Sequence, residues 1–284
     1  VRQAQYDATL DECLSVFKIQ HLNEVIMKHR FASFLPLVAV LMAASVLVTR
    51  AQNAPRDEQW KQVDEAVRKG LPKTAVERLE PILARAVKEK KWAEAINALG
   101  RKIALEGNVQ GNKPEEKIVR LEAELKKFPA EMKPVLHTVL AHWYWQYFQA
   151  NRYRFLQRTQ TASAPGKDFQ TWDLPRLFAE IEKQLVTALA STDTLKKIPV
   201  SDFDALLVKG NVPDSYRPTM YDFLAHEALA FYNSGEQAAA RSQAAFDLSA
   251  DSPVFSDTAQ FLAWKPDSKD DASPQLKAIR LYQQ

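Results

Sequence analysis

From Asp57 to the end of the chain, apolar residues recur every three or four positions, which is the period of an α-helix. The first run contains Val63, Ala66 and Val67, and Gly70 follows it as glycine often follows a helix C-terminus. Only 7 of the 284 residues are glycine, which disfavours turn-rich β-sandwiches and barrels. The sequence therefore predicts an all-α fold, built as an antiparallel array of helix pairs.

Capping signals predict where these helices begin and end. Thr74 with Glu77 has the spacing of a capping box, and Pro81 is expected to kink the helix that follows. Gly107 is expected to close the next helix. Similar signals predict further helices over 114–125, 134–151, 174–189, 220–231, 236–248, 256–264 and 274–284.

Two further features bear on the array. The segment around Trp92, Ala95 and Ile96 is reminiscent of a tetratricopeptide helix, so tetratricopeptide-like pairing is expected, although the 34-residue period does not recur. The last predicted helix reaches Gln284 without a C-terminal signal. The helical domain, assigned to residues 55–284, is therefore expected to be truncated at its C-terminus.

A secretory signal peptide is indicated at residues 27–51. A basic start after Met27 precedes an apolar run from Phe31 to Val48, and small residues follow. We expect cleavage between Ala51 and Gln52, which places the protein in the periplasm or cell envelope. The run is also long enough for an uncleaved membrane anchor, an alternative that Pro36 and the small residues disfavour.

Residues 1–26 precede this signal and are interpreted as an over-extended, unstructured gene start. They contain Cys13, the only cysteine of the chain. The mature protein would then have no disulfide, cysteine nucleophile or thiolate metal site.

The expected mature chain has no recognisable catalytic, cofactor or metal motif. His226-Glu227 begins a zinc-protease-like string, but no second histidine follows at the required spacing. There is no Gly-rich phosphate loop and no Gly-x-Ser-x-Gly elbow. A carboxylate pair such as Asp173 and Glu180 could in principle serve acid–base chemistry, without positive support. We therefore predict a protein that is not an enzyme and holds no cofactor.

The densest feature is an aromatic run at residues 142–148, which predicts either a core-filling helix or a ligand groove, the core being favoured. Arg152, Arg154 and Arg158 follow among further aromatics, a pattern that can bind single-stranded nucleic acid. The net charge of only +3 argues against nucleic acid. Ion pairs of these arginines with Asp168, Asp173 or Asp222, or contacts to a neighbouring domain, are expected instead.

A set of strings is notable: Leu-Pro-Lys-Thr-Ala at 71–75, Ala-His-Trp-Tyr-Trp-Gln-Tyr-Phe at 141–148, Asn-Arg-Tyr-Arg-Phe at 151–155 with Arg158 and Thr159, Thr-Trp-Asp at 171–173, and residues 217–225. Together these strings resemble the N-terminal region of large bacterial alpha-2-macroglobulin family proteins, of the kind found in Bacteroidetes and Planctomycetes. The resemblance covers about Asp57 to the end, and Arg-Pro-Thr-x-Tyr-Asp-Phe-Leu-Ala from Arg217 is its most specific part. Its signature residues, expected to be structural, are Trp143, Tyr144, Tyr147, Arg152, Arg154, Arg158, Trp172, Asp173, Arg217, Pro218, Thr219, Tyr221, Asp222 and Phe223.

The resemblance implies an envelope protein whose later part consists of β-sandwich macroglobulin domains. Some family members trap proteases through a bait region and a Cys-Gly-Glu-Gln thioester. Ser234-Gly235-Glu236-Gln237 copies that string without its reactive cysteine, so we interpret it as a coincidence at a helix boundary. The chain would be a non-catalytic helical leader, and endopeptidase inhibition or envelope defence would belong to the missing domains.

The partners implied are these downstream domains, with proteases or an envelope protein as further candidates. Nucleic acid is not expected as a partner. Membrane contact is expected only if the signal segment stays uncleaved. One alternative is a free-standing periplasmic scaffold that binds a partner through a concave helical face. Another is a helical-barrel enzyme acting on a glycan, which would need paired carboxylates in a deep pocket.

Overall fold

The computed structural model describes residues 56–109, 115–158, 166, 168–208, 211–237, 248–266 and 273–284. Within these ranges the regular structure is helical, apart from isolated bridge residues such as the antiparallel pair Pro199 and Thr219. The all-α prediction is therefore confirmed. The expected signal peptide, its cleavage point at Ala51 and Gln52, and most of the helix expected over 236–248 lie outside the described residues.

The chain divides into two compact units. The described residues between 56 and 136 and between 201 and 212 belong to the N-terminal unit, and those between 137 and 200 and between 213 and 284 belong to the C-terminal unit. The division falls inside helix α8 (Lys133–Ala150), between Leu136 and His137. No helix among the described residues combines the length and apolar character needed to cross a bilayer.

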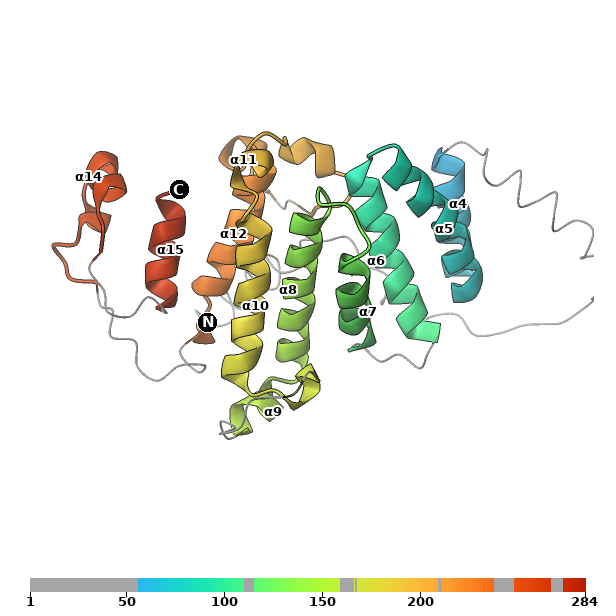
Figure 1. The fold of residues 1–284 in the computed structure, drawn as a ribbon, viewed down its shortest axis with the longest axis horizontal. Helices are drawn as coiled ribbons and strands as arrows, with labels where there is room; N and C mark the ends of the chain where they lie inside the picture. The colour runs from blue at the N-terminus through green and yellow to red at the C-terminus, as the bar shows by residue number, and fades with distance from the viewer. Residues whose placement is uncertain are drawn as a thin grey trace, which may run out of the picture. The chain divides into compact units, whose positions relative to one another are not determined.

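The N-terminal unit is a series of helices in which each contacts the next, shown in blue to green in Figure 1. Short turns join the first three helices, so successive members run antiparallel. The core between them is made of small and branched apolar side chains, including Val63, Leu79, Ile82 and Leu105. The helices are α4 (Arg56–Arg68), α5 (Pro72–Lys88), α6 (Trp92–Val109) and α7 (Glu116–Leu125). Whether their pairing is tetratricopeptide-like stays a prediction.

Two predicted boundaries in this unit are wrong. Helix α5 starts at Pro72, so Thr74 lies inside the first turn and does not cap it. Proline at the first turn has its φ already set for a helix, and the N–H that it lacks would have no partner there. Helix α6 continues through Gly107 to Val109, because Gly107 keeps a right-handed backbone and ends nothing. Helix α5 also continues through Pro81.

Gly70 alone among the described glycines has a positive φ, at 68°. An added Cβ would meet no atom within 4 Å, so a substitution would act on the backbone alone. We expect Gly70→Ala to lower the free energy of unfolding by about 1 kcal/mol, because a left-handed conformation disfavours residues with a Cβ. Gly107→Ala, inside helix α6, is the matched control and is expected to raise stability by about 0.5–1 kcal/mol. Urea denaturation of both variants tests this, and equal shifts would contradict it.

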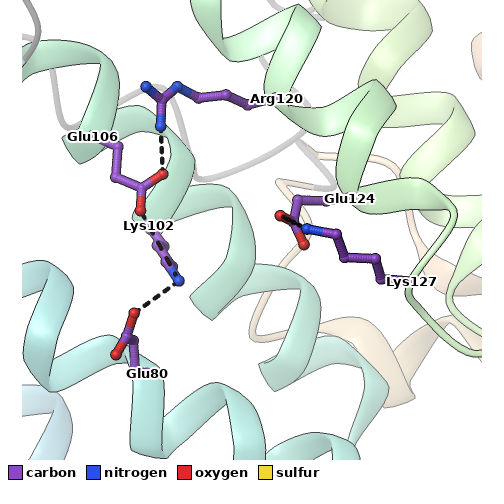
Figure 2. A network of polar contacts seen from close by, with 6 residues as sticks. All are labelled: Glu80, Lys102, Glu106, Arg120, Glu124 and Lys127. Carbon is purple, nitrogen blue, oxygen red and sulfur yellow. Dashed lines mark hydrogen bonds and ion pairs between the residues drawn. The ribbon is translucent and has the colours of Figure 1, made fainter.

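A chain of ion pairs crosses three helices of the N-terminal unit, as Figure 2 shows. Lys102 Nζ of α6 lies 3.0 Å from Glu80 of α5 and 4.0 Å from Glu106. Arg120 of α7 donates to Glu106 at 2.8 Å. The pairs are partly exposed, so each stabilises the unit by less than about 1 kcal/mol. They link the surfaces of α5, α6 and α7.

The C-terminal unit contains the rest of α8 and the shorter helices that follow it. Helix α10 contacts α12, and α12 also contacts α11 and α15. Helix α15 extends to Tyr282, with Gln283 as its C-cap. The elements after α8 are α9 (Arg152–Gln157), 3₁₀ helix η2 (Phe169–Thr171), α10 (Leu174–Leu189), α11 (Thr192–Leu195), η4 (Asp214–Tyr216), α12 (Met220–Tyr232), η5 (Pro253–Phe255), α14 (Thr258–Ala263) and α15 (Pro274–Tyr282).

The cap predicted for α12 is confirmed as a full capping box. Asp222 N–H donates to the Thr219 hydroxyl at 3.3 Å, and Thr219 N–H donates to the Asp222 carboxylate at 3.0 Å. Both groups therefore satisfy donors that a helix start leaves free. Backbone bonds from Val200 to Pro218 and from Met220 to Ile198 hold the same turn.

We expect Thr219→Ala to lower the free energy of unfolding by about 1 kcal/mol, the usual cost of removing an N-cap side chain. Thr219→Ser keeps the hydroxyl and is the control. Thermal unfolding followed by circular dichroism measures both variants. Equal loss in the two would mean that the methyl group, rather than the cap, matters at this position.

Candidate functional site

Helix α8 forms the aromatic centre of the C-terminal unit. Its sequence is aromatic on all sides, and the five rings between Trp143 and Phe148 are each at most 7% exposed. A helix that is apolar all round must be covered on most sides. The core interpretation of the aromatic run is therefore confirmed, and the groove interpretation is not supported by the buried rings.

One ring cluster joins α8 to α10 and α12. Trp145 lies 5.7 Å from Phe178 of α10 and 5.7 Å from Phe231 of α12, measured between ring centroids. Phe148 lies 5.1 Å from Phe178 with the ring planes at 83°. Such edge-to-face pairs add about 0.5–1.5 kcal/mol each beyond the area that they bury. This cluster holds the three longest helices of the unit together.

A second cluster contains most of the signature residues near α8. Tyr144 contacts Phe169 edge-on at 5.3 Å and stacks on Trp172 at 6.1 Å. Tyr147 contacts Phe155 at 6.0 Å and Phe169 at 5.0 Å. Ring contacts thus hold the segment from Phe169 to Trp172 against α8. The side chains of the signature residues Tyr144, Tyr147 and Trp172 are therefore part of the hydrophobic core.

The signature arginines complete this cluster in a way that corrects the expected ion pairs. Arg154 donates to the Tyr147 hydroxyl at 3.0 Å and to the Gln170 carbonyl at 2.7 Å. Arg158 donates to the Trp172 carbonyl at 2.6 Å and lies over the Phe155 ring. These guanidinium groups bind carbonyls and ring faces at the cluster, a use that their planar shape favours.

The carboxylate found for Arg152 is Glu236, at 2.8 Å, instead of one of the three expected aspartates. The aspartates cap the starts of helices. Asp168 accepts from Gln170 N–H and Asp173 from Arg176 N–H, while Asp222 belongs to the α12 box. Carboxylates are favoured there because free N–H groups and the helix dipole attract negative charge.

The remaining signature residues act locally at the start of α12. Arg217 lies over the Phe223 ring, with 5.2 Å between the guanidinium carbon and the ring centroid. Tyr221 donates its hydroxyl proton to Gln284 Oε1 at 2.6 Å. Pro218 supplies the carbonyl that Val200 binds. The signature thus falls into two groups of contacts, one around α8 and one at the entry to α12.

A small cavity of about 30 Å³ lies among α8, α10 and α12 of the C-terminal unit. This is room for about two water molecules. Two aromatic rings, Trp145 and Phe231, form part of its wall, and Glu227 brings a carboxyl to it. The other lining residues are Thr138, Ala141, His142, Ile181, Leu185 and Ala230.

Glu227, which the sequence indicated only as part of a zinc-protease-like string, is the carboxyl that lines this cavity. Burial raises the pKa of its carboxyl to about 8, against the opposing effect of Arg217. At pH 7 the side chain is therefore mainly protonated. Its sequence signal was present, because Glu227 follows Leu224 by three positions and precedes Phe231 by four, on the apolar face of α12.

The other polar candidates have partners within the fold. Glu180, 4% exposed, accepts from Lys183 at 2.8 Å and from Gln184 at 2.7 Å. His137 is bonded to Gln184 at 2.6 Å. The cavity wall thus has one carboxyl, whereas glycoside hydrolysis uses two. In the part of the chain that the structure describes, no three metal-ligating side chains come together.

The chain was compared with protein-family models, curated proteins and solved structures. No protein-family model, no curated protein and no solved structure matches the chain.

Proposed function

We propose that the chain is the non-catalytic helical leader of an exported alpha-2-macroglobulin-like protein of the periplasm or cell envelope. Export follows from the signal pattern at residues 27–51. The family follows from the resemblance of the signature strings. Endopeptidase inhibition or envelope defence would be the work of macroglobulin domains beyond Gln284.

The observation that carries the proposal is how the signature residues are used. Arg154 donates hydrogen bonds to Tyr147 and Gln170, and Arg158 donates one to Trp172, all within the same unit. Thr219 and Asp222 are hydrogen-bonded to each other in the capping box. Signature residues whose polar groups are engaged in internal contacts support a scaffold role better than a catalytic one.

The partners proposed are the downstream macroglobulin domains of the same protein, with a protease or an envelope protein as a further candidate. The chain would need no cofactor for this role. A membrane would be involved only through an uncleaved signal segment. A nucleic-acid role has no support in a chain of net charge +3.

The reading frame downstream of Gln284 in the native gene tests the family proposal. We expect it to encode successive β-rich domains of macroglobulin type. A stop codon directly after Gln284, or an unrelated domain there, would contradict the proposal.

A free-standing scaffold that binds a protein partner is the second candidate. It is favoured by three large apolar side chains in the last part of the described chain that are more than half exposed. Phe255 is 69% exposed, and Leu262 and Tyr282 are 52% and 55% exposed. A pull-down from envelope extract, repeated with Phe255→Ser and Leu262→Ser, would distinguish the two candidates. A partner lost in both variants favours the scaffold.

A further inference from the structure

The buried indole of Trp145 is used differently from two other indoles of the chain. Trp172 Nε1–H donates to the Gly166 carbonyl at 2.7 Å, and Trp60 Nε1–H donates to the Glu94 carboxylate at 2.9 Å. Trp145 is 3% exposed, yet among the described residues its buried Nε1–H has no hydrogen-bond partner. Buried donors are nearly always paired, because a donor that loses water without gaining an acceptor costs free energy. The Trp145 indole is therefore a donor that a ligand would satisfy.

Trp145 is part of the wall of the cavity among α8, α10 and α12. Its ring packs against three others, since the ring centroids of Phe148, Phe178 and Phe231 lie 5.4, 5.7 and 5.7 Å away. Phenyl rings have no lone pair, so the most that they offer an indole N–H is a weak contact with a ring face. The neighbouring rings thus fix the position of the indole and leave its N–H for a stronger acceptor.

The rest of the wall decides what kind of ligand can bring that acceptor. Glu227 lines the same cavity, where its carboxyl would oppose an anionic acceptor such as a carboxylate or a phosphate. His142 lines it too, and its Nε2 is bonded to Gln146 at 2.9 Å. The indole N–H itself carries positive partial charge, which disfavours a cation. Most of the other lining side chains are apolar, namely Ala141, Ile181, Leu185, Ala230 and Phe231. These walls suit a neutral oxygen acceptor on a small apolar body.

We propose that this cavity binds the carbonyl group of a small neutral ligand, with the carbonyl oxygen accepting from Trp145 Nε1–H and its carbon substituent against the apolar wall. The volume of about 30 Å³, or about two waters, suits a group of acetyl size and is too small for a ring. The cavity is partly open, so the remainder of a longer ligand would lie towards solvent. A carbonyl oxygen has lone pairs for the indole and needs no proton from the wall.

Titration of the whole chain with acetone, followed by NMR through the indole N–H signals, tests the proposal. The Trp145 signal is identified by its nuclear Overhauser contacts to Phe178 and Phe231, so this test needs no variant. We expect saturable binding that moves the signal downfield, as hydrogen bonding does, with a dissociation constant in the millimolar range because the probe is small. The Trp172 signal should stay in place, since its N–H is already bonded to Gly166. A Trp145 signal that acetone does not move would refute the site.

Xenon separates a carbonyl site from a merely apolar hole, because it fills apolar cavities and accepts no hydrogen bond. Trp145→Phe keeps an aromatic ring and removes the donor. The variant should therefore bind acetone about fivefold more weakly, the usual effect of one hydrogen bond, and should still bind xenon. Acetone binding that is unchanged in the variant, or that falls no more than xenon binding does, would overturn the proposal.

Ala230→Leu tests the place of binding, which matters if the loss of the indole disturbs the fold. Ala230 is half-buried in the cavity wall, so a larger side chain there should fill the space and abolish the acetone-induced shift. Ala259→Leu, at an exposed position of α14, is the matched control and should bind as the wild type does. A shift that survives in Ala230→Leu would place the probe elsewhere and contradict the proposal.

Two probes distinguish the source of the carbonyl group. Tighter binding of N-methylacetamide than of acetone would assign the site to a peptide carbonyl of a protein partner. Tighter binding of acetone would assign it to a free small ketone. Failure of both probes to bind would refute the site.

Discussion

Phe148→Ala is expected to lower the free energy of unfolding of the C-terminal unit by about 3–5 kcal/mol, the usual cost of deleting a fully buried phenylalanine ring. Phe148 is 0% exposed and contacts the rings of Trp145, Phe155 and Phe178. Its removal would leave a cavity where three elements meet. A change of this size is a large fraction of the stability of an ordinary domain.

Guanidinium chloride denaturation followed by tryptophan fluorescence measures the effect. Phe255→Ala is the matched control, because this ring is 69% exposed, and we expect a change within about 0.5 kcal/mol. Similar losses in the two variants would show that the aromatic run on α8 is not the core of the unit.

Glu227→Gln is expected to make the protein more stable than the wild type in alkaline solution, by on the order of 2–4 kcal/mol. Burial raises the pKa of the Glu227 carboxyl from 4.5 to about 8. The folded chain therefore keeps a proton between these values that the unfolded chain has lost. Wild-type stability should fall as the pH rises from about 4.5 to 8 and level off above that, whereas glutamine has no proton to lose.

The measurement is the difference in unfolding free energy between the two proteins at pH 5, 7 and 9. Other titrating groups contribute equally to both, so the difference isolates Glu227. We expect it to be smallest at pH 5 and largest at pH 9. A difference that stays constant over this range would mean that the Glu227 carboxyl is hydrated in the folded protein.

Helix starts were predictable where a side chain caps them, because the capping interaction is local. Asp173, Thr219 and Asp222 take the roles that their positions in the sequence indicated. Thr74 had the same spacing to Glu77, but Pro72 starts the helix earlier. Gly107 has the sequence position of a helix stop, but α6 continues through it, whereas Gly70 follows α4 with the left-handed backbone that such a stop uses.

The candidate site was less predictable, because it depends on contacts between distant helices. The aromatic run on α8 indicated a core, and the core was found. The partners of Arg154 and Arg158 are mainly backbone carbonyls, which every residue has and no side-chain pattern reveals. Glu227 reaches the cavity only because residues of α8, α10 and α12 come together around it, which is a feature of the tertiary structure.

Peptide-mapping mass spectrometry of the native protein, purified from the cell envelope of its source, tests the central proposal most directly. The proposal predicts a mature chain that begins at Gln52, is recovered from the envelope fraction, and continues beyond Gln284 into further domains. A cytoplasmic chain that begins at Val1 and ends at Gln284 would contradict both export and the role as a leader domain.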